Sequence, residues 1–489
     1  MEITMHGIQD SQLIKTFSYI DGSWHSSESY FNVTNPATGE VLVKVSNAGI
    51  VETELAVKAA KTALKAWSAK SANERAALMR NWFNLMIQHQ DDLARLLTLE
   101  QGKPFAEAKG EIGYGAAFVE WFAEEGKRVY GDTIPAPSGD KRIIVVKQPV
   151  GVVASITPWN FPNAMIARKA AAALAAGCTF VVRPATQTPL SALAMAELAE
   201  RAGIPAGVFN VVVGEDASGM GKVLTQHPDI AKFTFTGSTK IGKLLISQCA
   251  TTVKKVSMEL GGNAPFIVFD DADIDAAVEG AMASKYRNAG QTCVCTNRIF
   301  VQNGVLDIFT EKFSAAVAKL SIGNGLTEGV NIGPMISTTA VEGVNKLVTD
   351  SVAQGAKVLL GGQRDGAGDN FYQATILTNV RNDMPIARNE IFGPVSPIIA
   401  FEHEDQVIAM ANDSEYGLAA YFYARDIGRV WRVAEGLEYG MVGINEGIIS
   451  NAAAPFGGVK QSGSGREGSK YGLDDYLEIK YLCMGGLNK

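Results

Sequence analysis

The sequence predicts an α/β protein with two lobes, each built on a doubly wound, mostly parallel sheet. The first indication is a regular alternation of β-branched and helix-forming runs from Thr179 to Leu260, which is the pattern of βαβ units. The second is a return of this alternation after a glycine-containing break near Leu260–Ala264, where we expect a hinge. The third is length, since 489 residues suffice for about two to four domains.

Helical periodicity comes first along the chain. It predicts amphipathic helices near Glu54–Ala69 and Glu74–Leu97, whose apolar residues recur at helical spacing. In the first lobe we expect strands at Gly151–Ile156, Thr179–Arg183, Val208–Val213, Ala231–Thr236 and Lys254–Leu260. Between them we expect helices at Ala164–Ala176, Ser191–Ala202, Met220–Thr225 and Ile241–Cys249. In the second lobe we expect strands at Pro265–Phe269, Arg298–Gln302 and Ala356–Leu360, and helices at Ile274–Lys285, Leu306–Leu320 and Val341–Ala353.

Two further strand candidates lie outside this alternation. They are Arg142–Gln148, which precedes a proline, and Tyr476–Met484 near the end of the chain. Because an exposed strand edge needs a partner, these segments fit arms that join subunits. They fit two ordinary edge strands equally well.

Composition excludes several classes of function. Hydrophobic residues make up 47% and charged residues 19%, the balance of a globular protein with a large core. A net charge of −7 argues against a nucleic-acid partner, and five cysteines are too few for a disulfide scaffold. The longest apolar stretch, Ala170–Val182, is too short and interrupted to span a bilayer, and Met1–Gln12 lacks a signal-peptide pattern. We therefore expect a reduced, cytoplasmic protein with no membrane role.

Two glycine motifs resemble nucleotide-binding signatures. Gly463–Gly468 fits GxGxxG, but it follows a polar segment instead of a strand, so we expect a turn. Gly237–Leu244 is nearly a Walker A motif, yet Leu244 stands where Ser or Thr must hold Mg²⁺. A glycine turn into a helix N-terminus still binds anions, so Gly237, Ser238 and Gly242 fit either a pyrophosphate cradle or a plain βα turn.

Three residues carry candidate chemistry. Cys293 lies in a loop of small and polar residues, which suits a reactive thiol, although most cysteines are simply buried. Glu259 ends a strand before two glycines, a position that fits either a general base or a solvated turn residue. Asn160 follows a strand, where its amide can hold an oxyanion or form an Asx turn. A Cys–His hydrolase stays open, whereas the absence of CxxC and HExxH motifs and the scattered histidines predict no metal.

In order along the chain, seven segments resemble the NAD(P)-dependent aldehyde dehydrogenases. They are TPWNFP at 157–162, RPATQTP at 183–189, FTGSTKIG at 235–242, MELGGNAP at 258–265, GQTC at 290–293, EIFGP at 390–394 and PFGGVKQSG at 455–463. The resemblance covers about residues 20–480. It implies a Rossmann-like NAD(P)-binding domain at 1–138 and 152–262 and a catalytic domain at 263–440. The remaining 139–151 and 441–489 would form a small β oligomerisation arm and a C-terminal segment, in a homodimer or homotetramer.

The resemblance also implies roles for individual residues. Cys293 matches the nucleophile, Glu259 the general base and Asn160 the oxyanion donor. The positions that match cofactor contacts are Thr157, Trp159, Arg183, Ala185, Thr186, Gly237, Ser238, Gly242, Leu260, Glu390 and Phe392. Relatives that prefer NAD often carry glutamate at position 186, so Thr186 beside Arg183 favours NADP with NAD tolerated.

Within this family, three segments look like succinate-semialdehyde dehydrogenases. They are CVCTNR at 293–298, NEGIIS at 445–450 and KQSGSGREGSKYGLDDYLEIKY at 460–481. The likeness implies that Arg168, Arg287 and Ser450 clamp a distal carboxylate, although each arginine also fits a purely structural place at its helix. Glutarate or 2-oxoglutarate semialdehyde fits the same clamp.

Two other functions and one regulatory device stay open. A catalytically silent binding or structural protein is disfavoured because the nucleophile, base and oxyanion donor are all retained. A thioester-forming enzyme that passes its acyl group to coenzyme A is disfavoured because Glu259 supplies a base for water. If the loop is extended, Cys295 shares the face of Cys293, and the resemblance implies a reversible disulfide there.

Overall fold

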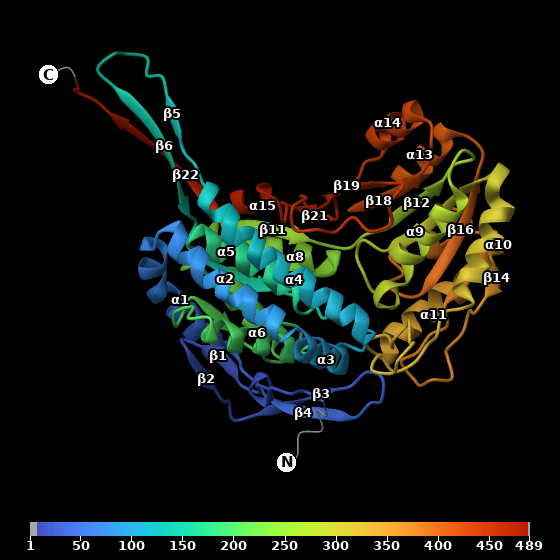
Figure 1. Ribbon diagram of the computed structural model, residues 1–489, viewed down its shortest axis with the longest axis horizontal. Coiled ribbons are helices and arrows are strands. Elements are labelled where there is room, and N and C mark those ends of the chain that lie inside the picture. Colours follow the sequence, from blue (N-terminus) through green and yellow to red (C-terminus); the bar gives the residue numbers. More distant parts are fainter. Residues whose placement is uncertain (1–6, 488–489) are drawn as a thin grey trace.

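The computed structural model describes residues 7–487, and two large sheets organise it (Figure 1). The first sheet has the order β2 (Ser23–His25), β1 (Ser18–Ile20), β9 (Phe209–Val211), β8 (Thr179–Arg183), β7 (Val152–Ile156), β10 (Ile230–Thr236), β11 (Lys255–Glu259) and β21 (Gly463–Ser464). Its five central strands are parallel, whereas β1 and β21 join antiparallel. This is the predicted βαβ lobe.

Alternation along these strands sends side chains to two helical layers. Val153 and Val182 face a core shared with α2 (Ala72–Gln88), α3 (Gln90–Gln101), α4 (Phe105–Glu125), α5 (Ala164–Ala176) and α6 (Pro189–Arg201). Val152, Ala154 and Val181 face α1 (Ile50–Ala69), α7 (Ala217–Gln226) and α8 (Thr239–Cys249). The sheet is therefore buried on both faces, as its continuous apolar runs predict.

The second sheet is also covered on both faces. Its order is β14 (Lys357–Leu360), β15 (Thr375–Thr378), β16 (Val395–Phe401), β13 (Thr296–Gln302), β12 (Ala264–Val268), β18 (Ala419–Tyr423) and β19 (Met441–Ile444). All neighbours are parallel except the pair β14 and β15. One face packs on α9 (Ile274–Tyr286) and α10 (Leu306–Val317), and the other on α11 (Thr338–Ala353), α12 (Pro385–Arg388), α13 (Glu404–Asn412) and α14 (Ile427–Gly436).

A three-stranded sheet projects away from both lobes (Figure 1). β22 (Leu477–Met484) pairs antiparallel with β6 (Arg142–Pro149), which also pairs with β5 (Asp132–Ile134). The two strands expected outside the main alternation are thus confirmed as strands. Ile479 and Tyr481 on β22 are 72% and 59% exposed, so this projection leaves apolar side chains in solvent.

The remaining elements are short. Paired strands are β3 (Tyr30–Thr34) with β4 (Val41–Ser46) and β17 (Tyr416–Gly417) with β20 (Val459–Lys460), and α15 (Tyr471–Asp474) precedes β22. Single turns of 3-10 helix lie at Ser11–Leu13, Gly126–Arg128, Ala250–Thr252, Arg287–Gly290 and Asn303–Val305. No helix between residues 7 and 487 is long and apolar enough to cross a membrane.

Two details differ from the sequence expectation. The helix predicted at 74–97 is wrong as a single element, because it breaks at His89. The break lets Asp92 at the start of α3 accept the backbone N–H groups of Gln9 and Asp10, at 2.8 and 3.0 Å. The GxGxxG segment is a turn, as predicted, although its first two residues also pair with β11.

Candidate active site

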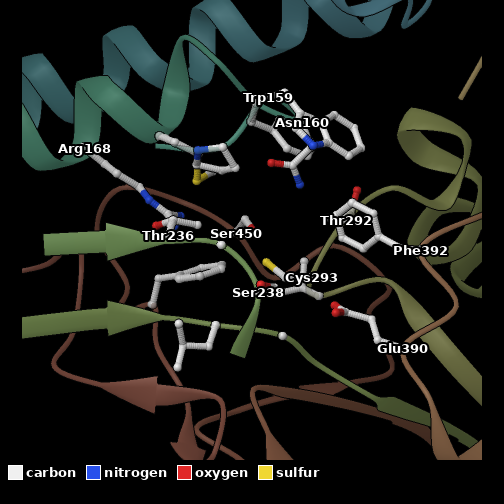
Figure 2. A pocket seen from close by; sticks show the side chains of 18 of the residues that line it. Trp159, Asn160, Arg168, Thr236, Ser238, Thr292, Cys293, Glu390, Phe392 and Ser450 are labelled. Carbon is white, nitrogen blue, oxygen red and sulfur yellow. The ribbon is translucent and has the colours of Figure 1, made fainter. Parts of the chain in front are cut away.

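A cavity of about 310 Å³ lies at the carboxyl ends of β7, β10 and β11 and is closed by segments of the second lobe (Figure 2). Crevices at the carboxyl ends of parallel strands are the usual ligand sites of such sheets. The predicted residues that line it are Trp159, Asn160, Arg168, Gly237, Ser238, Leu260, Arg287, Cys293, Glu390, Phe392 and Ser450. Those outside its wall are Thr157, Arg183, Ala185, Thr186, Gly242, Glu259 and Cys295.

A strained turn presents Cys293 to the cavity. Asn288, Ala289 and Gly290 have φ values of 52°, 54° and 75°, three left-handed residues in succession. A Cβ at Gly290 would lie 2.2 Å from the carbonyl oxygen of Gly393, so only glycine fits there. Strain of this kind concentrates at functional sites, and here it directs the chain from α9 into the cavity.

The Cys293 thiol is neutral in this state. Burial raises its pKa to about 12, and the nearby carboxyl groups of Glu390 and Glu259 add to the rise. The Arg168 and Arg287 guanidinium groups oppose it. These two cations are therefore the groups that favour the thiolate, the reactive form of a cysteine.

Asn160 lies across the cavity from Cys293 (Figure 2). Its side-chain Nδ2 donates to the carbonyl oxygen of Gln291 at 3.0 Å, while its Oδ1 has no partner among residues 7–487. Since an amide nitrogen carries two hydrogens, one remains for a ligand in the cavity. The geometry suits an oxyanion donor.

A buried ion pair holds the backbone of Asn160. Lys103 Nζ donates to the Asn160 carbonyl oxygen at 2.7 Å and to Glu111 Oε2 at 2.6 Å. Glu111 Oε1 accepts the backbone N–H groups of Asn163 and Ala164, at 3.0 and 3.2 Å. The pair thus fixes both the turn after β7 and the start of α5.

Glu259 lies behind the cavity in a cluster of buried charges. Burial, and then the Glu467 carboxylate, raise the pKa of Glu259 well above its ordinary value. Burial also acts to raise the pKa of Glu467. This rise is outweighed by Arg168 and Lys169, which form ion pairs with Glu467 and hold its pKa below the usual range. The Glu259 Oε2 atom has no hydrogen-bond partner within residues 7–487, so this carboxyl group is unsatisfied.

Two arginines face the interior of the cavity. Arg168 on α5 stacks on Phe456 at 4.4 Å, and its Nη1 and Nη2 atoms have no hydrogen-bond partner in the described chain. Arg287, just after α9, stacks on Phe161 at 5.4 Å and forms no ion pair with residues 7–487. Ser450 completes this end of the cavity (Figure 2). The structural alternative holds in part for Arg168, because its Nε pairs with Glu467.

The predicted pyrophosphate turn has the shape of a cradle. A Cβ at Gly242 would lie 2.4 Å from Leu260, and one at Gly237 would lie 2.4 Å from the ring of Phe235, so the backbone approaches its neighbours closely. Ser238 precedes α8, whose first N–H groups point to this turn. A helix N-terminus with such a turn fits a diphosphate.

Side chains of both lobes surround the adjoining part of the cavity. Trp159 and Phe392 meet edge to face, with ring centroids 5.6 Å apart. Glu390 Oε1 accepts the Gly262 N–H at 3.0 Å, and burial raises the pKa of Glu390 to about 7. A flat ring bearing a ribose fits between these groups.

Arg183 lies at the end of β8, away from the cavity wall. Its Nη2 donates to the carbonyl oxygen of Gly214 at 2.8 Å, and its buried Nε has no partner within residues 7–487. Thr186, three residues on, is half-buried, with its hydroxyl 3.3 Å from Gln187 Oε1. Arg183 thus places a guanidinium with an unpartnered Nε at the end of β8, in the same sheet as β10, which leads into the predicted pyrophosphate turn.

The expectation that an extended loop places Cys295 on the same face as Cys293 is wrong, because the loop forms a turn. The Cys295 N–H donates to the Thr292 carbonyl oxygen at 3.0 Å, which closes a turn around Cys293. The buried Cys295 thiol donates to the Lys285 carbonyl oxygen at 2.9 Å, and it does not line the cavity. The disulfide stays a prediction.

Sequence reasoning missed four residues around the site. They are Lys103, Glu111, Tyr114 and Glu467. Glu467 lies in the Gly463–Gly468 segment but was given no role, and the other three belong to α4 or the turn before it, a region for which no element was predicted. Burial of a charged side chain distinguishes Lys103, Glu111 and Glu467, and a buried hydroxyl distinguishes Tyr114.

Comparison with known proteins agrees with this geometry. The aldehyde dehydrogenase family model matches residues 24–482. A 3-sulfolactaldehyde dehydrogenase of Pseudomonas putida is 61% identical over 99% of both chains. The NADP(+)-type succinate-semialdehyde dehydrogenase GabD of Escherichia coli K12 is 62% identical over 98% of this chain and 99% of its own. The crystal structure of a succinate-semialdehyde dehydrogenase from Burkholderia pseudomallei, 58% identical, covers 98% of this chain and 100% of its own with a TM-score of 0.97.

The match extends over both lobes and the cavity between them. It confirms the two-lobed α/β fold and the resemblance drawn from the seven motifs. The protein is an enzyme that oxidises an aldehyde with NAD(P). The chain belongs to the aldehyde dehydrogenase family.

Proposed function

We propose that this enzyme oxidises a short aldehyde with a distal anionic group, and that succinate semialdehyde is its principal substrate. The observation that carries the proposal is the pair of arginines, Arg168 and Arg287, which line the same cavity as Cys293. Arg168 has unpartnered Nη1 and Nη2 atoms, and a guanidinium binds a carboxylate through charge-assisted hydrogen bonds. Ser450 supplies a hydroxyl at the same end.

Cys293 is the nucleophile in this proposal. Its thiolate attacks the aldehyde carbon, and the oxyanion of the resulting thiohemiacetal accepts hydrogen bonds from Asn160 Nδ2 and the Cys293 backbone N–H. The arginines serve twice, because they bind the distal anion and also lower the pKa of the thiol. A bound NAD(P) would supply the hydride acceptor that this oxidation needs, and Cys293 would hold the acyl group as a thioester until water releases the acid.

Glu259 is the general base for release of the acid. Burial raises its pKa and so makes the carboxylate a stronger base toward water, and the water then attacks the thioester. Because Glu259 lies behind the cavity wall, it acts through a water molecule or after a side-chain rotation. A base in this position favours hydrolysis over transfer to coenzyme A.

NADP is the preferred cofactor in our proposal, with NAD tolerated. Gly237, Ser238 and Gly242 would hold the diphosphate, and Trp159, Leu260, Glu390 and Phe392 the nicotinamide riboside; Thr157 and Ala185 would line the cleft between. Arg183 would pair the 2′-phosphate through its free donor, and Thr186 adds no repelling carboxylate. The NADP-type relative from Escherichia coli supports this choice.

The same clamp admits other anions. Glutarate or 2-oxoglutarate semialdehyde adds only chain length or a keto group, and the relative named for 3-sulfolactaldehyde indicates that a sulfonate is a further candidate. The name of the relative from Escherichia coli and that of the Burkholderia structure favour succinate semialdehyde.

Assembly, domain limits and location belong to the same proposal. The exposed apolar side chains of β22 support a homodimer or homotetramer joined through the projecting sheet. We place the limit between the cofactor-binding and catalytic domains at residues 262 and 263, where the chain crosses from β11 of the first sheet to β12 of the second. We expect a cytoplasmic enzyme, because its few cysteines are unpaired within residues 7–487.

Substitution of Arg287 tests the proposal. Arg287→Ala should raise KM for succinate semialdehyde about 10-fold to 100-fold, because a charge-assisted hydrogen bond contributes about 1.5–3 kcal/mol. The KM for butanal, which has no carboxylate, should change far less. Equal effects on both aldehydes would refute the clamp.

A further inference from the structure

Tyr114 on α4 lines the cavity, and its buried hydroxyl lies near the guanidinium groups of Arg168 and Arg287. The residue lines the cavity wall, and its ring meets Phe118 edge to face with centroids 5.0 Å apart. The hydroxyl is fully buried, and no group within residues 7–487 accepts a hydrogen bond from it, whereas the neighbouring Arg168 guanidinium can donate to its oxygen. A buried hydroxyl hydrogen without an acceptor is unfavourable, and a ligand in the adjoining cavity can supply the acceptor.

Close packing of two helices brings Tyr114 to this position. The next residue is Gly115, where a Cβ would lie 2.4 Å from Asn163 Oδ1 and 3.3 Å from Ala164 Cα. Glycine therefore lets α4 approach the start of α5, the helix that carries Arg168. The hydroxyl and the guanidinium reach the cavity from adjacent helices.

Each of the three groups has a hydrogen to donate to a common ligand. A guanidinium has no acceptor, so neither Arg168 nor Arg287 can take the phenol proton. Burial raises the pKa of Tyr114, although both arginines oppose the rise, so the hydroxyl keeps its proton at neutral pH. A ligand that accepts from all three must offer several acceptor atoms beside two cations, which fits a carboxylate or sulfonate.

We propose that Tyr114 donates a hydrogen bond to the distal anion of the substrate and is a specificity-determining residue of the clamp. The inference rests on the proposed function, since it assumes that a terminal anion occupies this end of the cavity. It adds a neutral donor from α4 to the two cations, so the anion is held from α4, α5, the turn after α9 and the loop with Ser450.

Tyr114→Phe removes the hydroxyl and keeps the ring. We expect KM for succinate semialdehyde to rise about tenfold or more, since a hydrogen bond to a charged group contributes about 1.5–3 kcal/mol. The inhibition constant of succinate, used as a non-reactive anion, should rise by a similar factor. The loss on butanal should be at least about fivefold smaller than the loss on succinate semialdehyde.

Thermal unfolding separates binding from a structural role. Without ligand, Tyr114→Phe should have a Tm equal to or above that of the wild type, because an unsatisfied hydroxyl is removed. Tyr372→Phe is the matched control: its hydroxyl donates to Asn345 at 3.3 Å, outside the cavity wall. This control should leave both KM and the succinate inhibition constant unchanged.

The outcomes distinguish this inference from the proposed function. If the wild type prefers succinate semialdehyde but Tyr114→Phe keeps its KM and its succinate inhibition constant, the role of Tyr114 is refuted and the arginine clamp stands. If Tyr114→Phe unfolds at a lower Tm with unchanged KM, the hydroxyl is structural and the inference is again wrong. If the wild type itself prefers butanal and ignores succinate, the proposed function fails.

Discussion

Removal of the Lys103 ammonium group should impair both folding and turnover. Lys103 and Glu111 are 1% and 0% exposed at their side chains, and Lys103 also supports the Asn160 carbonyl oxygen. Deletion of one partner of a buried ion pair leaves the other charge unpaired and typically costs about 3–5 kcal/mol. We therefore expect Lys103→Met to lower the free energy of unfolding by about that amount.

Turnover should fall in the same variant, because the turn that carries the oxyanion donor loses a hydrogen bond at 2.7 Å. We expect kcat to fall by about 10-fold to 100-fold, which does not exceed the fall in kcat expected when the oxyanion donor Asn160 is itself removed. Urea unfolding followed by tryptophan fluorescence measures the first effect, and steady-state kinetics with saturating cofactor measures the second.

An exposed pair of the same kind provides the control. Lys109 and Asp91 are joined at 2.6 Å, like the buried pair, but their side chains are 46% and 70% exposed. Lys109→Met should change the free energy of unfolding by less than about 1 kcal/mol and leave kcat unchanged. If Lys103→Met behaves like this control, the buried pair neither stabilises the fold nor positions Asn160.

Three further predictions concern the reacting groups. Asn160→Ala should reduce turnover by about 10²–10³-fold without loss of cofactor affinity. An unchanged acylation rate together with lost cofactor binding would contradict its role. Because Glu259 acts in its ionised form and its pKa is raised, thioester release should increase as pH rises above the ordinary 4.5 of a glutamate, and Glu259→Gln should abolish this rise in single-turnover assays. Peroxide should inactivate the enzyme reversibly by dithiol, and the same reversible inactivation of Cys295→Ala would disprove a disulfide with Cys293.

Much of the fold was predictable because local patterns and global architecture agree. Alternating β-branched and helical runs predicted the five parallel strands of the first sheet and β12 and β13 of the second, but not β15, β16, β18 or β19. Asn160 and Glu259 were expected at or after strand ends, and Cys293 in a loop between a helix and a strand. The break at His89 was not predictable, since it depends on Asp92 capturing the N–H groups of Gln9 and Asp10, about eighty residues earlier.

The surroundings of the reacting groups escaped sequence reasoning for a related reason. Lys103 lies 57 residues from Asn160, and Glu467 lies 298 residues from Lys169, so no local spacing links them. Tyr114 belongs to a helix whose glycines weaken the periodic signal, although Gly115 is the residue that lets it approach α5. Only tertiary packing reveals these partners.

The central claim is that two arginines select an aldehyde with a distal negative charge. The most direct measurement compares kcat/KM for succinate semialdehyde with that for its methyl ester, which has the same aldehyde chain but no charge. With two guanidinium groups facing the cavity, we expect the acid to be preferred by at least about 100-fold. Equal values of kcat/KM, or a preference for the ester, would contradict the account.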